Sequence, residues 1–195
     1  MQLFKPSYRS FSDEKLMQTL SRGDKRAFDE LYSRYAKALK GYFMRMLWKN
    51  EGKAEDFVHD LFVKIIHNPE SFDSNRSFKT WLYSVACNMC KNEYKKQEVR
   101  KGTISGIDQF YSISDKGVDV LNEVQMSHFG SQFEKSMVEL KSEHQEVFAL
   151  RHMDGLSIKE IAEVLDINEG TVKSRLFYAT KQLADKLKEF NTVNT

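Results

Sequence analysis

Residues 156–176 have the sequence LSIKEIAEVLDINEGTVKSRL, which predicts two short helices separated by a tight turn. Asn168 stands immediately before the second helix, where asparagine is a favoured N-cap. Ala162, Ile167 and Val172 are spaced five residues apart, where two steeply crossing helices need one small residue and two apolar ones. The stretch therefore predicts a helix-turn-helix motif.

The second helix of this motif has an apolar stripe and an opposite face without acidic residues. Residues 170–183 contain three positive charges and no negative one. An α-helix fits the major groove of DNA, where Arg and Lys contact guanine and Ser or Thr contact phosphates. A helical hairpin with a solvated polar face is the alternative interpretation, and DNA binding is favoured. The predicted DNA contacts are Thr171, Lys173, Ser174, Arg175, Phe177, Tyr178 and Lys181.

The composition of the whole chain agrees with a helical protein. Its 195 residues include only two prolines and nine glycines, so few residues interrupt helices. Thirty basic residues against 28 acidic ones leave a net charge of +2, which excludes a histone-like polycation. No apolar run is long enough to span a membrane, and the first residues do not have the pattern of a secretory signal. We therefore expect a cytoplasmic, all-α protein.

The amino-terminal half is predicted to be a bundle of helices that follows a loose arm over residues 1–11. A helical pattern begins at Ser12, and residues 22–24 interrupt it once. Asn68 and Pro69 end a later helix, because proline cannot continue the hydrogen-bond ladder, and Ser77 is expected to cap the next one. The apolar face expected of the helix after residue 24 comprises Phe28, Leu31, Tyr35, Leu39, Tyr42 and Met46.

Residues 76–101 combine positive charge with aromatic side chains. Seven basic residues and two acidic ones, Glu93 and Glu98, give a net charge of +5, and Trp81 and Tyr94 are among the interleaved rings. Cations for phosphates and rings for unstacked bases are what single-stranded nucleic acid requires of a binding site. Rings at helical spacing are also common in a protein core, so both interpretations stay open here.

Residues 99–130 are predicted to be a long, flexible acidic linker. The stretch 102–134 has one lysine against five acidic residues, a net charge of −4, and no clear apolar period. A linker of this length is unusual in a compact domain and is expected to be functional or extended. After it, helices are expected from the capping-box spacings Ser131/Glu134, Ser142/Gln145 and Ser157/Glu160.

Taken in order, these features resemble RNA polymerase sigma factors of the extracytoplasmic-function (ECF) type, in the sigma-70 family. The resemblance covers roughly three-quarters of the chain, and the combination of motifs is much more specific than a lone helix-turn-helix. The matching stretches are DKRAFDELYSRYAKALKGY (24–42), AEDFVHDLFVKII (54–66), FDSNRSFKTWLYSVACNMCKNEY (72–94) and residues 146–183.

The resemblance implies two small helical domains and a division of labour between them. Residues 12–98 would be sigma region 2, which binds core polymerase and opens the −10 element, and residues 131–190 would be region 4, which binds the −35 element. Residues 99–130 would link them and thread the RNA path of the polymerase, and residues 191–195 would be a tail.

The resemblance also implies roles for individual residues. Asp56, Asp60 and Phe62 would contact core polymerase. The helix-turn-helix face given above would contact the −35 element. The residues that would contact the −10 element are Phe72, Asn75, Arg76, Lys79, Trp81, Asn88, Lys91, Lys95 and Lys96.

The partners implied by the family are core RNA polymerase, through its β′ clamp and β flap, promoter DNA, and an anti-sigma factor, which is often membrane-bound. No cofactor, metal or small-molecule substrate is expected, and no catalytic constellation is found. The chain departs from the family pattern at Asp166, where glycine is common, at Leu140–Ser142, which lack a frequent proline, and at Tyr178, where a basic residue is frequent.

Three other interpretations are weighed against this one. A conventional helix-turn-helix regulator would bind palindromic DNA without polymerase. A nucleic-acid enzyme would need a carboxylate cluster, and residues 76–101 offer only Glu93 and Glu98. Cys87 and Cys90 have the spacing of redox or metal pairs, but packing inside a helical core is the favoured interpretation because further metal ligands are not evident.

Overall fold

The computed structural model describes residues 8–47, 49–103, 123–188 and 190. Every regular element within these residues is helical, which confirms the predicted fold class. The chain folds into two compact units, residues 1–96 with 159–167 and residues 97–158 with 168–195.

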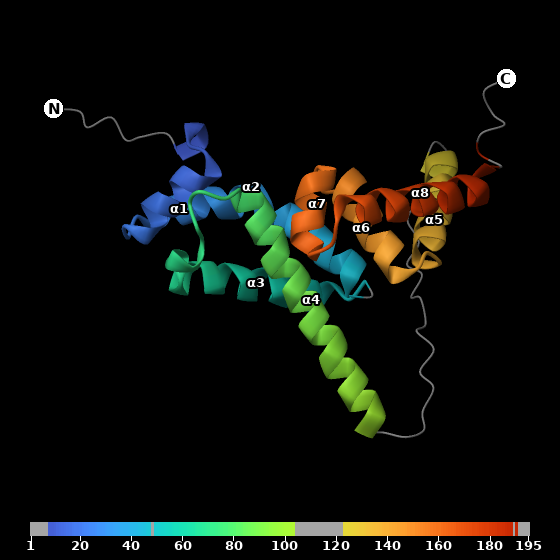
Figure 1. Cartoon of the computed structure of the whole chain (residues 1–195), viewed down its shortest axis with the longest axis horizontal. Coiled ribbons are helices and arrows are strands. Elements are labelled where there is room, and N and C mark those ends of the chain that lie inside the picture. Colours follow the sequence, from blue (N-terminus) through green and yellow to red (C-terminus); the bar gives the residue numbers. More distant parts are fainter. Residues whose placement is uncertain (1–7, 48, 104–122, 189, 191–195) are drawn as a thin grey trace. The chain divides into compact units, whose positions relative to one another are not determined.

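The amino-terminal part of the first unit contains four α-helices and two short 3-10 helices (Figure 1). The predicted start at Ser12 is confirmed, because its side chain accepts a hydrogen bond from the Lys15 N–H and caps α1. Gly23 lies between the first two α-helices with φ at 92°, a conformation that glycine adopts without strain. The elements are η1 (Tyr8–Ser10), α1 (Asp13–Ser21), α2 (Lys25–Met46), α3 (Glu51–His67), η2 (Pro69–Ser71) and α4 (Phe78–Thr103).

The core of the first unit lies where α2 packs on α1 and α3. On the predicted face of α2, Leu31, Leu39 and Tyr42 are fully buried. Helix α3 ends at His67, just before Asn68 and Pro69, so the predicted end of that helix is confirmed. Helix α3 begins at Glu51, because the side chain of Asn50 accepts a hydrogen bond from the Lys53 N–H and caps it.

The predicted loose arm is wrong for residues 8–11, which are held by an arginine of α2. The guanidinium of Arg34 donates hydrogen bonds to the backbone oxygens of Tyr8, Arg9 and Phe11 at 2.9–3.2 Å. The same group forms an ion pair with Asp13 at 2.7 Å. Because all five N–H groups of arginine are donors in a fixed fork, one side chain can hold several acceptors at once. Residues 1–7 lie outside the described part.

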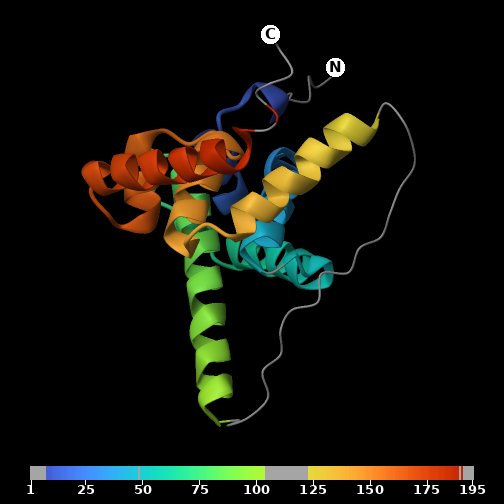
Figure 2. The same cartoon turned by 90° about the vertical axis from the view of Figure 1, so that its right-hand side faces the viewer.

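The second unit contains α5 (Glu123–Val138), α6 (Ser142–His152) and α8 (Glu169–Lys186), while α7 (Ile158–Leu165) is grouped with the first. Its core is a cluster of Met137, Leu140, Ala179 and Leu183. Phe133 and Phe148 pack against this cluster and join α5 and α6 to α8. Figure 2 gives a second view of these helices.

Helices extend into both ends of the predicted linker. Helix α4 continues to Thr103 (Figure 2), and α5 already begins at Glu123. The capping prediction at Ser131 is therefore wrong, because this serine lies inside α5. Ser142 is also not a cap, since α6 begins at Ser142 itself after Lys141. Residues 104–122 of the linker lie outside the described part of the chain. The prediction that the linker is flexible therefore stays a prediction.

Within the described residues, no helix is both long enough and apolar enough to cross a membrane.

Candidate nucleic-acid interface

The start of α4 is capped by a side chain from the beginning of α1. Oε1 of Glu14 accepts a hydrogen bond from the Phe78 N–H at 3.1 Å. Ser77, the cap expected from the sequence, accepts from the Thr80 N–H at 3.3 Å. Two side chains thus satisfy backbone donors that every helix leaves without partners at its first turn. The loop before α4 is anchored at this end.

Replacing Glu14 by glutamine is expected to destabilise the protein in a pH-dependent way. Burial alone would raise the pKa of Glu14, but hydrogen bonds from the backbone of Phe78 and Glu14 and from Ser12 lower it below its usual value. Because the pKa is lower in the folded state than in the unfolded state, ionised Glu14 stabilises the fold at pH values above 4.5, the pKa of the unfolded state. This stabilisation is lost as the pH falls and the carboxylate is protonated.

At pH 7 the Glu14→Gln variant should lose about 1 kcal/mol, as is typical of a helix cap. Thermal unfolding of both proteins from pH 7 to pH 3 measures this difference, which should shrink below pH 4.5. A difference that stayed constant down to pH 3 would contradict an ionised cap.

Aromatic rings next to this cap form a cluster that is mostly core. Phe72, only 8% exposed, lies 5.4 Å from Phe78 and 5.3 Å from Trp81 between ring centroids. Phe78 and Tyr83 are buried as well. The core interpretation of these rings is therefore the better one, and Phe72 is corrected from a DNA contact to a support for the loop. Trp81 stays half-buried.

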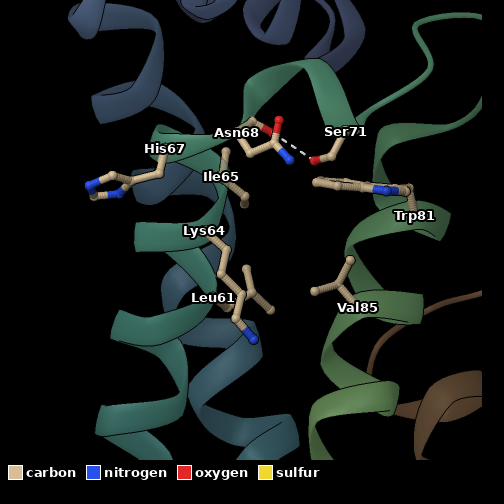
Figure 3. Close-up of a pocket in the computed structure, with 8 residues that line it drawn as sticks. All are labelled: Leu61, Lys64, Ile65, His67, Asn68, Ser71, Trp81 and Val85. Carbon is tan, nitrogen blue, oxygen red and sulfur yellow. Dashed lines mark hydrogen bonds between the residues drawn. The ribbon is translucent and has the colours of Figure 1, made fainter.

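The edge of Trp81 borders an open hollow of about 400 Å³ between α3, η2 and α4 (Figure 3). Trp81 and Val85 point from α4 toward Leu61 and Ile65 of α3, so apolar groups form two walls. Polar groups lie along its rim, and Ser71 Oγ donates a hydrogen bond to the backbone oxygen of Asn68 at 2.6 Å. Its size is in the usual range for small-ligand pockets. The other two lining residues are Lys64 and His67.

Sequence reasoning found only Trp81 among the residues that line this hollow. Leu61 and Ile65 are buried apolar residues of α3, and neither they nor Lys64 belong to a motif that points to a binding site. One feature of the sequence could have indicated the hollow. Asn68 and Ser71 are polar residues that directly follow the end of α3, where a helix has backbone groups without partners.

Beyond the hollow, α4 carries a polar face that continues from Trp81. Asn88, Lys91 and Lys95 are exposed and follow Trp81 at spacings of seven, three and four residues, which places them on one side of the helix. Lys96 is exposed beside them. Glu93 is held by Lys53 of α3 in an ion pair at 2.5 Å. Glu98 is exposed three residues after Lys95 on the same side, so this face combines three lysines with one carboxylate.

The loop before α4 and the first turn of α4 hold the remaining predicted −10 contacts. Asp73 Oδ1 accepts hydrogen bonds from the backbone N–H and the side-chain amide of Asn75, at 2.9 and 3.0 Å. This turn fixes the backbone, while Asn75 and Arg76 are exposed and Lys79 is half-buried. The loop is thus short and anchored, and its polar side chains are on the surface.

Helix α3 presents Asp56 and Asp60 on its exposed side, one turn apart. Phe62 lies elsewhere: it is 2% exposed and packs on Phe28 and Tyr32 of α2, with centroids 5.7 and 4.8 Å away. The prediction of Phe62 as a surface contact is therefore corrected to a core position. Tyr32, 46% exposed, is the ring at the surface there, and it lies one turn after Phe28 in the sequence.

The local structure of the helix-turn-helix segment agrees with its sequence pattern. Asn168 Oδ1 accepts a hydrogen bond from the Thr171 N–H at 2.7 Å, which confirms the predicted cap of α8. In the turn, Asp166 has φ at 57°, the left-handed conformation that glycine adopts most easily and Asp tolerates. This explains how the chain accommodates aspartate where glycine is common in the resembling family.

The two faces of α8 differ as predicted. Val172, Ala179 and Leu183 are buried. Thr171 and Arg175 are half-buried. The other predicted −35 contacts are exposed, namely Lys173, Ser174, Phe177, Tyr178 and Lys181. One helix face therefore brings all seven predicted residues together.

The two cysteines lie in the core of the first unit. Cys87 and Cys90 are both on α4, and both side chains are buried. In the part of the chain that the structure describes, no group of three or more histidine, cysteine or acidic residues is arranged to hold a metal ion. The packing interpretation fits this placement.

Comparison with known proteins covers both units. Family models described as Sigma-70 region 2 and Sigma-70, region 4 match residues 31–100 and 131–183. The ECF RNA polymerase sigma-E factor of Haemophilus influenzae is 31% identical over 182 residues, which cover 90% of this chain and 95% of that relative. The chain therefore belongs to the ECF family of RNA polymerase sigma factors.

A second relative is the ECF RNA polymerase sigma factor SigW of Bacillus subtilis, which is 28% identical over 90% of this chain and 97% of its own length. Among solved structures, the complex of CnrH with the cytosolic domain of CnrY matches with a TM-score of 0.67 at 23% identity, covering 92% of this chain and 99% of that one. The complex of the sigma factor RpoE with the anti-sigma factor NepR from Bartonella quintana also gives 0.67, at 22% identity and coverages of 86% and 98%. These structures support the fold.

Proposed function

We propose that this chain is a promoter-specificity subunit that binds core RNA polymerase, directs it to promoters and opens the −10 element. The observation that carries the proposal is the similarity to an ECF sigma factor over 90% of the chain. The similar region includes the residues around the hollow and the face of α8 that has no acidic residue. The factor acts on the polymerase as an initiation factor and has no chemistry of its own. Its site of action is the cytoplasm, where polymerase and promoter DNA are found.

In the first unit, the hollow beside Trp81 receives an unpaired base of the −10 element. The half-buried side chains of Trp81 and Val85 provide the apolar surface for a base, while Asn68 and Ser71 offer polar groups at its edge. Lys91 and Lys95 follow the sugar-phosphate backbone along α4. Base stacking on a protein contributes about 1–3 kcal/mol per base, and each DNA stacking step that is lost costs about 1.4 kcal/mol. Captured bases can therefore offset opening of a few base pairs.

In the other unit, α8 lies in the major groove of the −35 element, with its cationic and hydroxyl side chains toward the DNA. Asp56 and Asp60 of α3 contact the β′ clamp of core polymerase, and region 4 contacts the β flap. An anti-sigma factor is a further partner, since two matched structures are complexes and one of them names its partner as such. In this proposal, residues 12–98 act as sigma region 2 and residues 131–190 act as sigma region 4.

Transcription with purified components tests the proposal. Core polymerase of the encoding organism is mixed with the full chain and genomic DNA fragments, and the 5′ ends of the transcripts are mapped. We expect discrete start sites that share −10 and −35 elements and that core polymerase alone does not use. Failure of the chain to bind core polymerase, or binding to palindromic DNA in its absence, would favour the conventional regulator instead.

A further inference from the structure

The outer face of α8 has aromatic side chains at its centre. Phe177 is 62% exposed and Tyr178 is 56% exposed, and their rings meet edge to face with centroids 5.5 Å apart. Lys173 and Lys181 lie one turn before and after Phe177, and Arg175 lies one turn before Tyr178. Cations therefore surround two rings on a face that would otherwise be polar throughout.

The ring of Tyr178 is supported by a second helix of the same unit. His144, in the first turn of α6, stacks on it with centroids 6.0 Å apart and ring planes within 13° of parallel. This is the offset stacking that aromatic pairs favour. Nδ1 of His144 is buried and has no hydrogen-bond partner among the described residues. No hydrogen bond with these residues at Nδ1 therefore holds the imidazole, and packing fixes this side of the ring. His144 contacts Tyr178 through the face of its ring.

The chemistry of the major groove suggests what such a ring can contact. Donors and acceptors line the edges of the bases, and the 5-methyl group of thymine is the only apolar group among them. An arginine or lysine at this position would bind guanine or a phosphate. A ring that is held on one side and exposed on the other can instead cover a methyl group.

We propose that Tyr178, positioned by His144, determines specificity by contacting the 5-methyl group of a thymine in the −35 element. The inference rests on the proposed function, because it requires α8 to lie in the major groove. Tyr178 contacts the DNA itself, and His144 is a positioning residue that limits the orientations of the phenol ring.

Replacing single thymines by deoxyuridine tests this directly, since it removes one methyl group and leaves every hydrogen-bonding group in place. The holoenzyme is titrated against a promoter from the start-site mapping in which each −35 thymine is replaced in turn. We expect one position at which the affinity falls about fourfold, the value of burying one methyl group. Tyr178→Ala should abolish this difference at that position, and Tyr178→Phe should retain it.

Variants of His144 test the positioning role. His144→Ala should reduce the thymine-over-uracil ratio, and His144→Phe, which keeps an aromatic ring, should restore it. Gln145→Ala, a half-buried neighbour on α6, is the matched control and should leave the ratio unchanged.

Two results would overturn the inference: no −35 position sensitive to loss of a thymine methyl, or a sensitivity that persists in Tyr178→Ala. Both would occur with a holoenzyme that still binds its promoter. A holoenzyme that binds no promoter at all would refute the proposed function itself.

Discussion

Replacing Asp56 or Asp60 by lysine is expected to weaken binding to core polymerase about a hundredfold. Both carboxylates are exposed on one side of α3, so reversal of their charge leaves the core of the protein intact. On a complementary surface, placing like charges opposite each other costs several kcal/mol. Titration of labelled protein against core polymerase measures the loss, and the effect should diminish at high salt.

The control for this prediction is Asp29→Lys, a reversal at an acidic surface residue of α2. It changes the net charge of the chain by the same amount and should leave the affinity for core polymerase within about twofold. If Asp56→Lys and Asp60→Lys bound core polymerase as tightly as the wild type, this side of α3 could not be the clamp contact.

The second large effect is expected from the double substitution Lys173→Ala and Arg175→Ala. Each cation on the outer face of a recognition helix is worth about 1–3 kcal/mol in contacts to bases or phosphates, so the loss of both should weaken promoter binding by at least about thirtyfold. Binding to core polymerase should change little, because Asp56 and Asp60, which are proposed to contact its clamp, lie on α3. Run-off transcription from a mapped promoter and core titration measure the two quantities separately.

Lys135→Ala, which removes an exposed cation from α5, provides the matched control and should retain promoter binding. A promoter whose −10 region is already unpaired should still show the defect, since the −35 contact precedes opening. Loss of core binding in the double variant would instead assign this face of α8 to the polymerase.

Features that depend on neighbours in the sequence could be predicted from it. The caps Ser12, Ser77 and Asn168 and the buried stripe of α8 follow from local hydrogen-bonding capacity and from apolar spacing. The residues proposed to contact the −35 element could be predicted as a group because they all lie on one side of one helix. The family itself could be named from the order of its motifs.

Features that depend on contacts across the sequence could not be predicted in the same way. The family resemblance implied that Phe62 contacts polymerase and that Phe72 contacts DNA, but no local pattern could show that Tyr32 and Trp81 lie against these rings. Arg34 holds residues 23 to 26 positions before it, and no local pattern reveals such a contact. The stack of His144 on Tyr178 likewise requires α6 and α8 to pack together.

The carboxylate of Glu14 has a consequence for the design of experiments on this protein. It is 64 positions away from the amide that it caps, so the amino-terminal end of the chain supports the segment proposed to hold the −10 strand. A deletion that removes α1, or a fused tag that displaces it, would therefore loosen the first turn of α4. Tags intended to leave DNA binding unaffected are better placed at the carboxyl terminus.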